Sequence, residues 1–188
     1  MDIKKQLHDY AVDVAQRVVV SDFDQLASIV QRLVQAKTEG RTVYTAGNGG
    51  SAATASHLCN DLVKGCRVND REGFRAVCLA DSNAIITCLA NDFKYEDIFS
   101  IQLKTFAVKG DVLIVFSGSG NSPNIIEALK TARATGVFTI GFSGRDGGKM
   151  KDLCDLLLIA PTDSMEQIED MHLLYEHAMI GSIKKFFE

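Results

Sequence analysis

Two short stretches of this 188-residue chain combine glycine and serine in a way suited to binding an anion. Residues 44–53 read YTAGNGGSAA, and residues 114–124 read IVFSGSGNSPN. In each, an apolar run leads through a small-residue loop into helix-forming residues. Glycines let the backbone approach a ligand, amide N–H groups at a helix start attract negative charge, and serine hydroxyls add donors. Both loops therefore predict phosphate binding, although Ser122 before Pro123 is also suited to capping a helix.

The first loop fits the motifs of nucleotide-binding proteins poorly. A Walker loop requires a lysine that AGNGGSAA lacks. Gly47, Gly49 and Ala52 satisfy the G-x-G-x-x-A pattern of dinucleotide-binding folds. The acidic residue expected about 20 positions later, however, falls near Asp70, ahead of the second predicted strand. A simpler phosphorylated ligand fits this loop better.

Histidine and carboxylate groups occur close to the first loop and near the C-terminus. His57 and Asp61 are four residues apart, which places them on one face of a helix directly after the loop. A second group lies on the predicted C-terminal helix and comprises Glu169, His172, Glu176 and His177. Such groups can transfer protons or hold a divalent metal. The alternatives are a simple hydrogen-bonded pair for the first group and, for all but His177, a solvated helix face.

The elements that must position these residues alternate along the chain. Five apolar runs predict buried strands, namely RTVYTA, FRAVCLA, DVLIVF, VFTIGF and DLLLIA. Helical stretches separate them, which predicts a parallel sheet with helices on both faces and with ligand-binding loops at its carboxyl edge. We expect one domain over residues 1–188. Residues 1–38 would form two helices broken near 21–25, with Ser21 as an N-cap, and 39–188 the α/β core.

The core is expected to end in a long helix from Ser164 to about Phe187. Ser164 and Gln167 form the S-x-x-Q pattern of a capping box at its start.

Composition excludes several classes of function. Lysine and arginine number 20 against 24 aspartates and glutamates, and this acidic balance argues against direct binding to nucleic acid. Charged residues interrupt the N-terminal apolar positions, so neither a signal peptide nor a membrane span is expected. The five cysteines contain no C-x-x-C pair, which points to reduced thiols in the cytoplasm.

Several motifs occur together, in an order and at spacings that resemble one family. They are GNGGSAATASH, ANDFKYEDIFSIQL, SGSGNSPNIIEAL, GFSGRDGGKM and IEDMHLLYEHAM. The chain resembles the sugar isomerase (SIS) domain family, most closely its bacterial phosphoheptose isomerases. The resemblance implies a three-layer, flavodoxin-like α/β sandwich with a five-stranded parallel sheet. It also implies a homotetramer with active sites between subunits. The implied reaction converts sedoheptulose 7-phosphate to D-glycero-D-manno-heptose 7-phosphate, for heptose-containing surface glycans.

The resemblance also assigns roles to residues. The implied contacts to the phosphorylated sugar are Gly49, Gly50, Ser51, Asn91, Asp92, Ser117, Gly118, Ser119 and Ser122. The implied ligands of Zn²⁺ or another divalent metal are His57, Asp61, Glu169 and His177. Asp61 and His177 are the implied catalytic acid–base pair. Because Glu169 and His177 lie eight residues apart, roughly 12 Å along a helix, both reach one ion only if extended, or they serve different subunits.

Four residues of this chain differ from those that the family has at the same positions. Asp61 replaces a glutamate, Glu169 a glutamine, Thr54 an aspartate and Gly118 a threonine. A shorter base at position 61 reaches less far, and about 1 Å of misplacement can cost a hundredfold in rate. Two alternatives therefore stand beside phosphoheptose isomerisation. One is isomerisation of a different phosphosugar. The other is a non-catalytic SIS module that binds a phosphosugar or a protein partner, as the replication-initiator-associating relative does.

Overall fold

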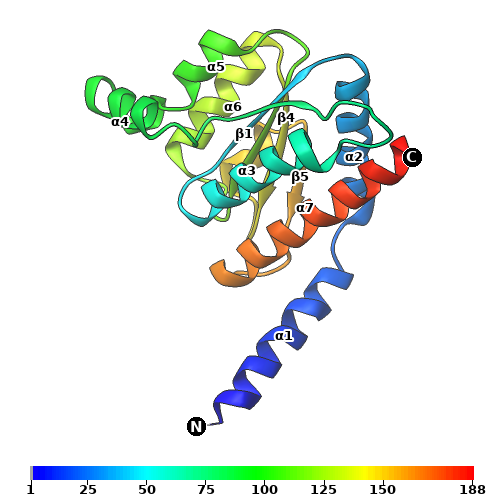
Figure 1. The fold of residues 1–188 in the computed structure, drawn as a ribbon. Helices are drawn as coiled ribbons and strands as arrows, with labels where there is room; N and C mark the ends of the chain where they lie inside the picture. Colours follow the sequence, from blue (N-terminus) through cyan, green and yellow to red (C-terminus); the bar gives the residue numbers. More distant parts are fainter. Residues whose placement is uncertain (1) are drawn as a thin grey trace.

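A single five-stranded parallel sheet forms the centre of the computed structural model, which describes residues 2–188 (Figure 1). The strands are β1 (Thr42–Ala46), β2 (Arg75–Cys78), β3 (Val112–Ser117), β4 (Phe138–Ser143) and β5 (Leu156–Ile159). Their order across the sheet is β2-β1-β3-β4-β5, so the chain reverses its direction of travel between β1 and β3. All five strands predicted from the apolar runs are confirmed, and so is their parallel arrangement.

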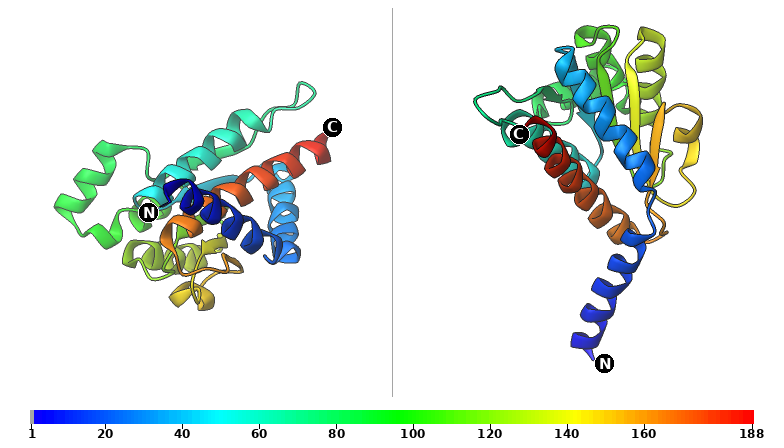
Figure 2. Two further views of the ribbon diagram at one scale, coloured as in Figure 1. Left: turned by 90° about the horizontal axis from the view of Figure 1, so that it is seen from below. Right: turned by 90° about the vertical axis from the view of Figure 1, so that its right-hand side faces the viewer.

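Helices cover both faces of the sheet and create two apolar cores. Residues 2–188 contain seven α-helices: α1 (Ile3–Val19), α2 (Phe23–Thr38), α3 (Gly50–Asn60), α4 (Asn83–Asp92), α5 (Ser100–Phe106), α6 (Pro123–Thr135) and α7 (Met165–Phe187). Helices α2, α3 and α7 pack on one face, and α5 and α6 pack on the other (Figures 1 and 2). Three short helices complete the described chain: η1 (Asp61–Gly65, a π-helix), η2 (Tyr95–Asp97) and η3 (Gly148–Asp152).

The break between the two N-terminal helices is confirmed, but its cap differs from the prediction. Asp22, not Ser21, is the N-cap of α2, and its carboxylate accepts a 2.8 Å hydrogen bond from the Gln25 amide. The Ser21 hydroxyl lies 2.5 Å from the Tyr175 hydroxyl instead, and it also bonds to the Arg17 carbonyl. Ser21 therefore links the end of α1 to α7.

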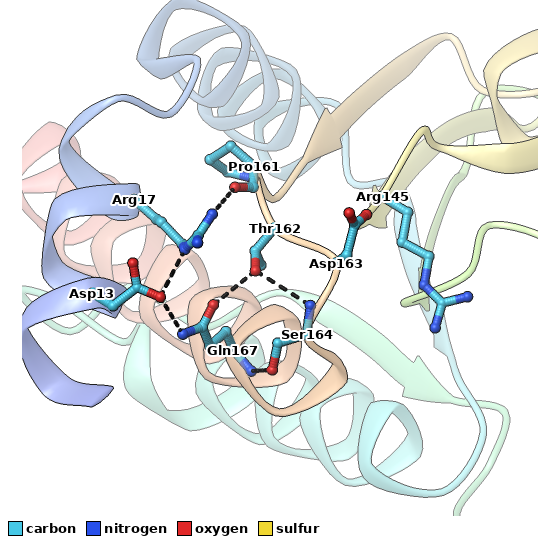
Figure 3. A pocket seen from close by; sticks show the side chains of 8 residues that line it. All are labelled: Asp13, Arg17, Arg145, Pro161, Thr162, Asp163, Ser164 and Gln167. Atoms are coloured by element: carbon cyan, nitrogen blue, oxygen red, sulfur yellow. Dashed lines mark hydrogen bonds and ion pairs between the residues drawn. The ribbon is translucent and has the colours of Figure 1, made fainter. Parts of the chain in front are cut away.

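The start of α7 is capped by Ser164 as predicted, at 3.5 Å from the Gln167 amide. The second half of the capping box is missing, because the Gln167 side chain makes other bonds. Its oxygen accepts from the Thr162 hydroxyl at 2.7 Å, and its amide donates to Asp13 at 2.7 Å (Figure 3). Gln167 thus ties α1 to the loop that precedes α7.

Two helices project from the body of the molecule. Neither α1 nor α4 contributes a buried residue within the described chain, and both extend away from the sheet (Figures 1 and 2). Apolar side chains on α1 are exposed, including Ile3 and Leu7, which are 65% and 69% accessible. Within residues 2–188, no helix combines the length and apolar character that crossing a bilayer requires.

Candidate functional site

The two glycine- and serine-rich loops follow β1 and β3, the neighbouring strands between which the strand order of the sheet reverses. Strands β1 and β3 are hydrogen-bonded neighbours with Ala46 opposite Val115, so the loops that follow them lie side by side. The amides of Asn48 and Asn124 lock the loops together through two reciprocal hydrogen bonds of 2.9 and 2.7 Å. The Tyr95 hydroxyl donates to Asn48 as well, at 3.1 Å. Ligands of open α/β sheets bind at such a point.

A cavity of about 320 Å³ opens between these loops. It is lined by Asn48, Gly49, Gly50, Ser51, Phe116, Ser117, Gly118, Ser119, Ser122, Met165 and Glu169. Gly49 has φ +55°, a left-handed backbone that favours glycine and that turns the chain into α3. The structure therefore brings together all seven glycines and serines assigned to the loops by the sequence.

The serine hydroxyls of this cavity make few hydrogen bonds within the described chain, so donors are available for an anion. Ser122 occupies the N-cap position of α6 but makes no side-chain capping bond within the described chain. Its hydroxyl lies 3.1 Å from that of Ser117 instead. The predicted N-cap position of Ser122, with Pro123 starting α6, is thus confirmed, but the Ser122 hydroxyl is not used as a cap within residues 2–188. Together with the amides at the start of α3, the hydroxyls form a neutral donor surface suited to a phosphate.

A second group of side chains lies farther along α3 and α7. His57, Asp61, Glu176 and His177 each place a ligand atom within 4.8 Å of the others. Nε2 of His57 is 3.9 Å from Oδ2 of Asp61. The rings of His57 and His177 pack edge to face, with their centroids 5.0 Å apart. At metal–ligand distances of about 2.0–2.2 Å, the N and O ligand atoms of a tetrahedral zinc ion lie about 3.3–3.6 Å from one another, so side-chain rotations that move these atoms by about 1 Å would close the cluster.

Asp61 lies where the α-helix α3 continues into the π-helical turn η1. It is the first residue of η1, where its carbonyl accepts a 2.9 Å bond from the amide five residues ahead, at Cys66. A π-helical turn adds one residue to the helix and is frequent at functional sites. The Asp61 side chain is only 22% exposed, whereas that of His57 is 42% exposed.

Two titratable residues of α7, His172 and Glu176, are buried, contrary to the possibility of a solvated helix face. His172 is 1% exposed, and its Nε2–H donates to the Ser143 carbonyl at 3.1 Å. Burial lowers the pKa of His172 to about 4. Glu176 is fully buried, and neither carboxylate oxygen has a hydrogen-bond partner within residues 2–188. Burial raises the pKa of Glu176 to about 8, and the nearby Asp61 carboxylate adds to the rise.

Three of the sequence-assigned residues lie outside the groups expected for them. Glu169 is not a member of the histidine–carboxylate cluster, because it lies two helical turns before His177 and packs against Gly50 in the cavity. Asn91 and Asp92 are exposed at the end of α4, where the Asn91 amide donates to the Asp92 carboxylate at 2.8 Å. A single chain does not bring them to the cavity, since α4 projects from the sheet (Figure 1).

Sequence reasoning named Glu176 in the C-terminal group but did not include it among the metal ligands, although the chain carries a signal for it. The apolar residues of α7 repeat at helical spacing through Ile168, Tyr175, Met179 and Ile183, and all four are buried. Glu176 falls within this stripe. A carboxylate on the buried face of a helix requires a partner, because the charged form is costly to bury alone.

Comparisons with known proteins agree with this architecture. The family model for the SIS domain matches residues 6–144. The phosphoheptose isomerase of Clostridium acetobutylicum is 39% identical over 162 residues, which cover 86% of this chain and 82% of the relative. That of Paramagnetospirillum magneticum is 44% identical over 158 residues, 82% of each chain. A solved phosphoheptose isomerase from Francisella tularensis superposes with a TM-score of 0.92 at 25% identity, over 98% of this chain and 100% of that one. This chain therefore belongs to the SIS domain family and, within it, to the phosphoheptose isomerases.

Proposed function

We propose that this protein interconverts sedoheptulose 7-phosphate and D-glycero-D-manno-heptose 7-phosphate. The observation that carries the proposal is the position of two sites along the same pair of helices. Ser51 in the cavity and His57 in the cluster are six residues apart on α3, about 9 Å along its axis. An extended seven-carbon phosphate is long enough to span this separation. Its phosphate would lie in the cavity and its carbonyl end beside the cluster.

The phosphate end would be held by neutral donors. The hydroxyls of Ser51, Ser117, Ser119 and Ser122 would donate to the phosphate oxygens, and the amides of Gly49 and Gly50 would add to them. Hydrogen bonds to a charged group contribute more than those between neutral groups, about 1.5–3 kcal/mol each. Such binding holds the far end of the sugar still, and this orients the carbonyl carbons for reaction.

The residues of the cluster fit a divalent metal ion. Two imidazoles and two carboxylates are the donor types that zinc accepts, and two negative charges balance a divalent cation. The unpartnered oxygens of Glu176 supply the structural reason to expect a cation there. We propose His57, Asp61 and His177 as three of its ligands. When bound, such an ion polarises a sugar carbonyl and stabilises negative charge on its oxygen.

The isomerisation moves one carbon-bound proton and one oxygen-bound proton. A base removes the proton from C1 of the ketose, and the electron pair forms a C1–C2 double bond while the C2 oxygen takes up negative charge. Return of the proton to C2, with loss of the proton on the C1 oxygen, gives the aldose. We assign the carbon-bound proton to Asp61. His177 would move the proton between the two oxygens.

The assembly is proposed to be a homotetramer with active sites between subunits. Supporting this, α1 has no buried residue in the described chain and exposes Ile3 and Leu7. Asn91 and Asp92, which are assigned to substrate binding by the family resemblance, lie on the projecting α4. A neighbouring subunit would receive them. All five cysteines are free thiols, in keeping with a reducing cytoplasm.

The test is NMR of the purified protein with sedoheptulose 7-phosphate in deuterated water, with zinc and with a chelator. We expect aldose signals and deuterium at C2 with zinc, and neither after chelation. Asp61→Ala is the matched variant and should bind the sugar phosphate without turning it over. Binding of the phosphosugar by the wild-type protein without turnover would refute this reaction and favour a different substrate or a non-catalytic binding module.

A further inference from the structure

Glu176 is a buried carboxylate to which the proposed proton transfers assign no role. It is fully buried, and both of its oxygens lack a hydrogen-bond partner within the described chain. Its helical neighbours Tyr175, Met179 and Ile180 belong to the apolar core. Buried carboxylates are normally paired or coordinate metals, since desolvation of the charge is otherwise uncompensated.

The surroundings of Glu176 contain the other members of a metal site. His57 and Asp61 approach it from α3 and η1, and His177 follows it on α7, with all ligand atoms within 4.8 Å. No ion pair to lysine or arginine involves Glu176 within residues 2–188. The group that completes this set of donors is therefore a cation from outside the chain.

Two features of the structure favour Glu176 over Glu169 as the fourth donor. Glu169 lies about 10 Å earlier on the helix, at seven residues of separation, and its carboxylate packs against Gly50 in the phosphate cavity. In addition, Glu176 places a carboxylate oxygen within 4.8 Å of the ligand atoms of His57, Asp61 and His177, and Glu169 is not a member of this cluster.

We propose that Glu176 is a direct ligand of the metal, in a centre formed by His57, Asp61, Glu176 and His177. Glu169 then belongs to the substrate cavity and not to the metal centre. The inference rests on the proposed function, because it concerns the metal proposed for that same site. The two proposals can be tested separately, because metal affinity is measured without any substrate.

The experiment titrates the metal-free protein with Zn²⁺ by calorimetry and with Co²⁺ by visible absorption. Three variants of one helix are compared: Glu176→Gln, Glu169→Gln and, as the control, Glu166→Gln in the exposed first turn. Loss of an outer-shell partner costs about 10–100-fold in metal affinity, so loss of a direct ligand should cost at least about 100-fold. We expect this loss, with an altered Co²⁺ spectrum, only for Glu176→Gln. The other two variants should bind within about threefold of wild type.

Unchanged Co²⁺ affinity and spectrum in Glu176→Gln would overturn the inference, as would a loss of the same size in Glu169→Gln. If the glutamine variant does not fold, Glu176→Leu removes the donor and leaves an apolar side chain in the apolar surroundings, and the same criterion applies to it. The two proposals fail separately. Wild-type protein that isomerises the sugar while Glu176→Gln binds metal normally refutes only this inference. Metal binding through Glu176 without turnover refutes only the proposed reaction.

Discussion

His172 makes a stability prediction that follows directly from its burial. The side chain is 1% exposed, packs near the rings of Phe116 and Phe142, and donates to the Ser143 carbonyl. Its pKa is about 4 in the folded protein against an ordinary value of 6.5. The unfolded chain therefore binds more protons than the folded chain between these two values. The stability that this histidine contributes is complete above about pH 6.5 and is lost as pH falls toward 4.

The size of the effect follows from the difference between the two pKa values. A gap of 2.5 units corresponds to about 3.4 kcal/mol in full. Between about pH 7 and about pH 4.5 the expected loss is about 2.4 kcal/mol, because His172 does not complete its titration in that range. Carboxylates elsewhere also titrate there, so the wild-type profile alone does not isolate the histidine.

The assay compares the wild type with His172→Gln, which keeps an N–H donor but does not titrate. Denaturant unfolding of both proteins is measured at about pH 7 and about pH 4.5, at one protein concentration, because assembly alters apparent stability. The wild type should lose about 2.4 kcal/mol more than the variant does. An equal loss in the two proteins would refute the reasoning, even if the variant is less stable throughout.

Three further predictions concern the phosphate loops and the histidine–carboxylate cluster. Ser117→Ala and Ser122→Ala should each raise the KM for the sugar phosphate about tenfold or more, because each removes a donor to the phosphate. Steady-state kinetics measure this, and an unchanged KM would contradict the proposed phosphate contacts. Gly118→Thr should lower the free energy of unfolding by less than about 1 kcal/mol, since a Cβ there would lie 2.5 Å from Sδ of Met165, the end of a flexible and exposed side chain that can rotate away. A larger loss in thermal unfolding would contradict this reading of the loop. Asp61→Ala should lower kcat about a hundredfold or more, because it removes the base. Asp61→Glu keeps a carboxylate that reaches the carbon-bound proton and should retain turnover. Equal kcat values for the alanine variant and the wild type would exclude Asp61 as the base.

The elements and loops of this fold can be predicted from the sequence because their signals are local. Each strand is a continuous apolar run, and each phosphate loop is a cluster of glycine and serine after such a run. Two neighbouring loops follow from the parallel arrangement alone. The capping of α2 by Asp22 in place of Ser21 is a local ambiguity, since both residues are good N-caps and lie side by side.

The membership of the cluster depends on information that is not local. Whether Glu169 or Glu176 approaches His57 is decided by how α7 crosses α3 and by which face of α7 meets the sheet. The interlocked amides of Asn48 and Asn124 likewise join residues 76 positions apart. Neither pairing leaves a pattern in a single sequence that spacing rules detect.

The weak attachment of α1 has a consequence for amide hydrogen exchange. None of its residues is fully buried in the single chain. Only Val14 and Val18 pack against the apolar core, and its other links are polar, such as the 2.5 Å bond from Tyr10 to Asp170. An isolated helix of 17 residues is marginal in water, so its amides exchange through local opening without unfolding of the sheet. Amides of the buried β3 exchange only when the core opens. If subunits cover α1, its protection rises with protein concentration while that of β3 does not, so one exchange experiment reports assembly and folding separately.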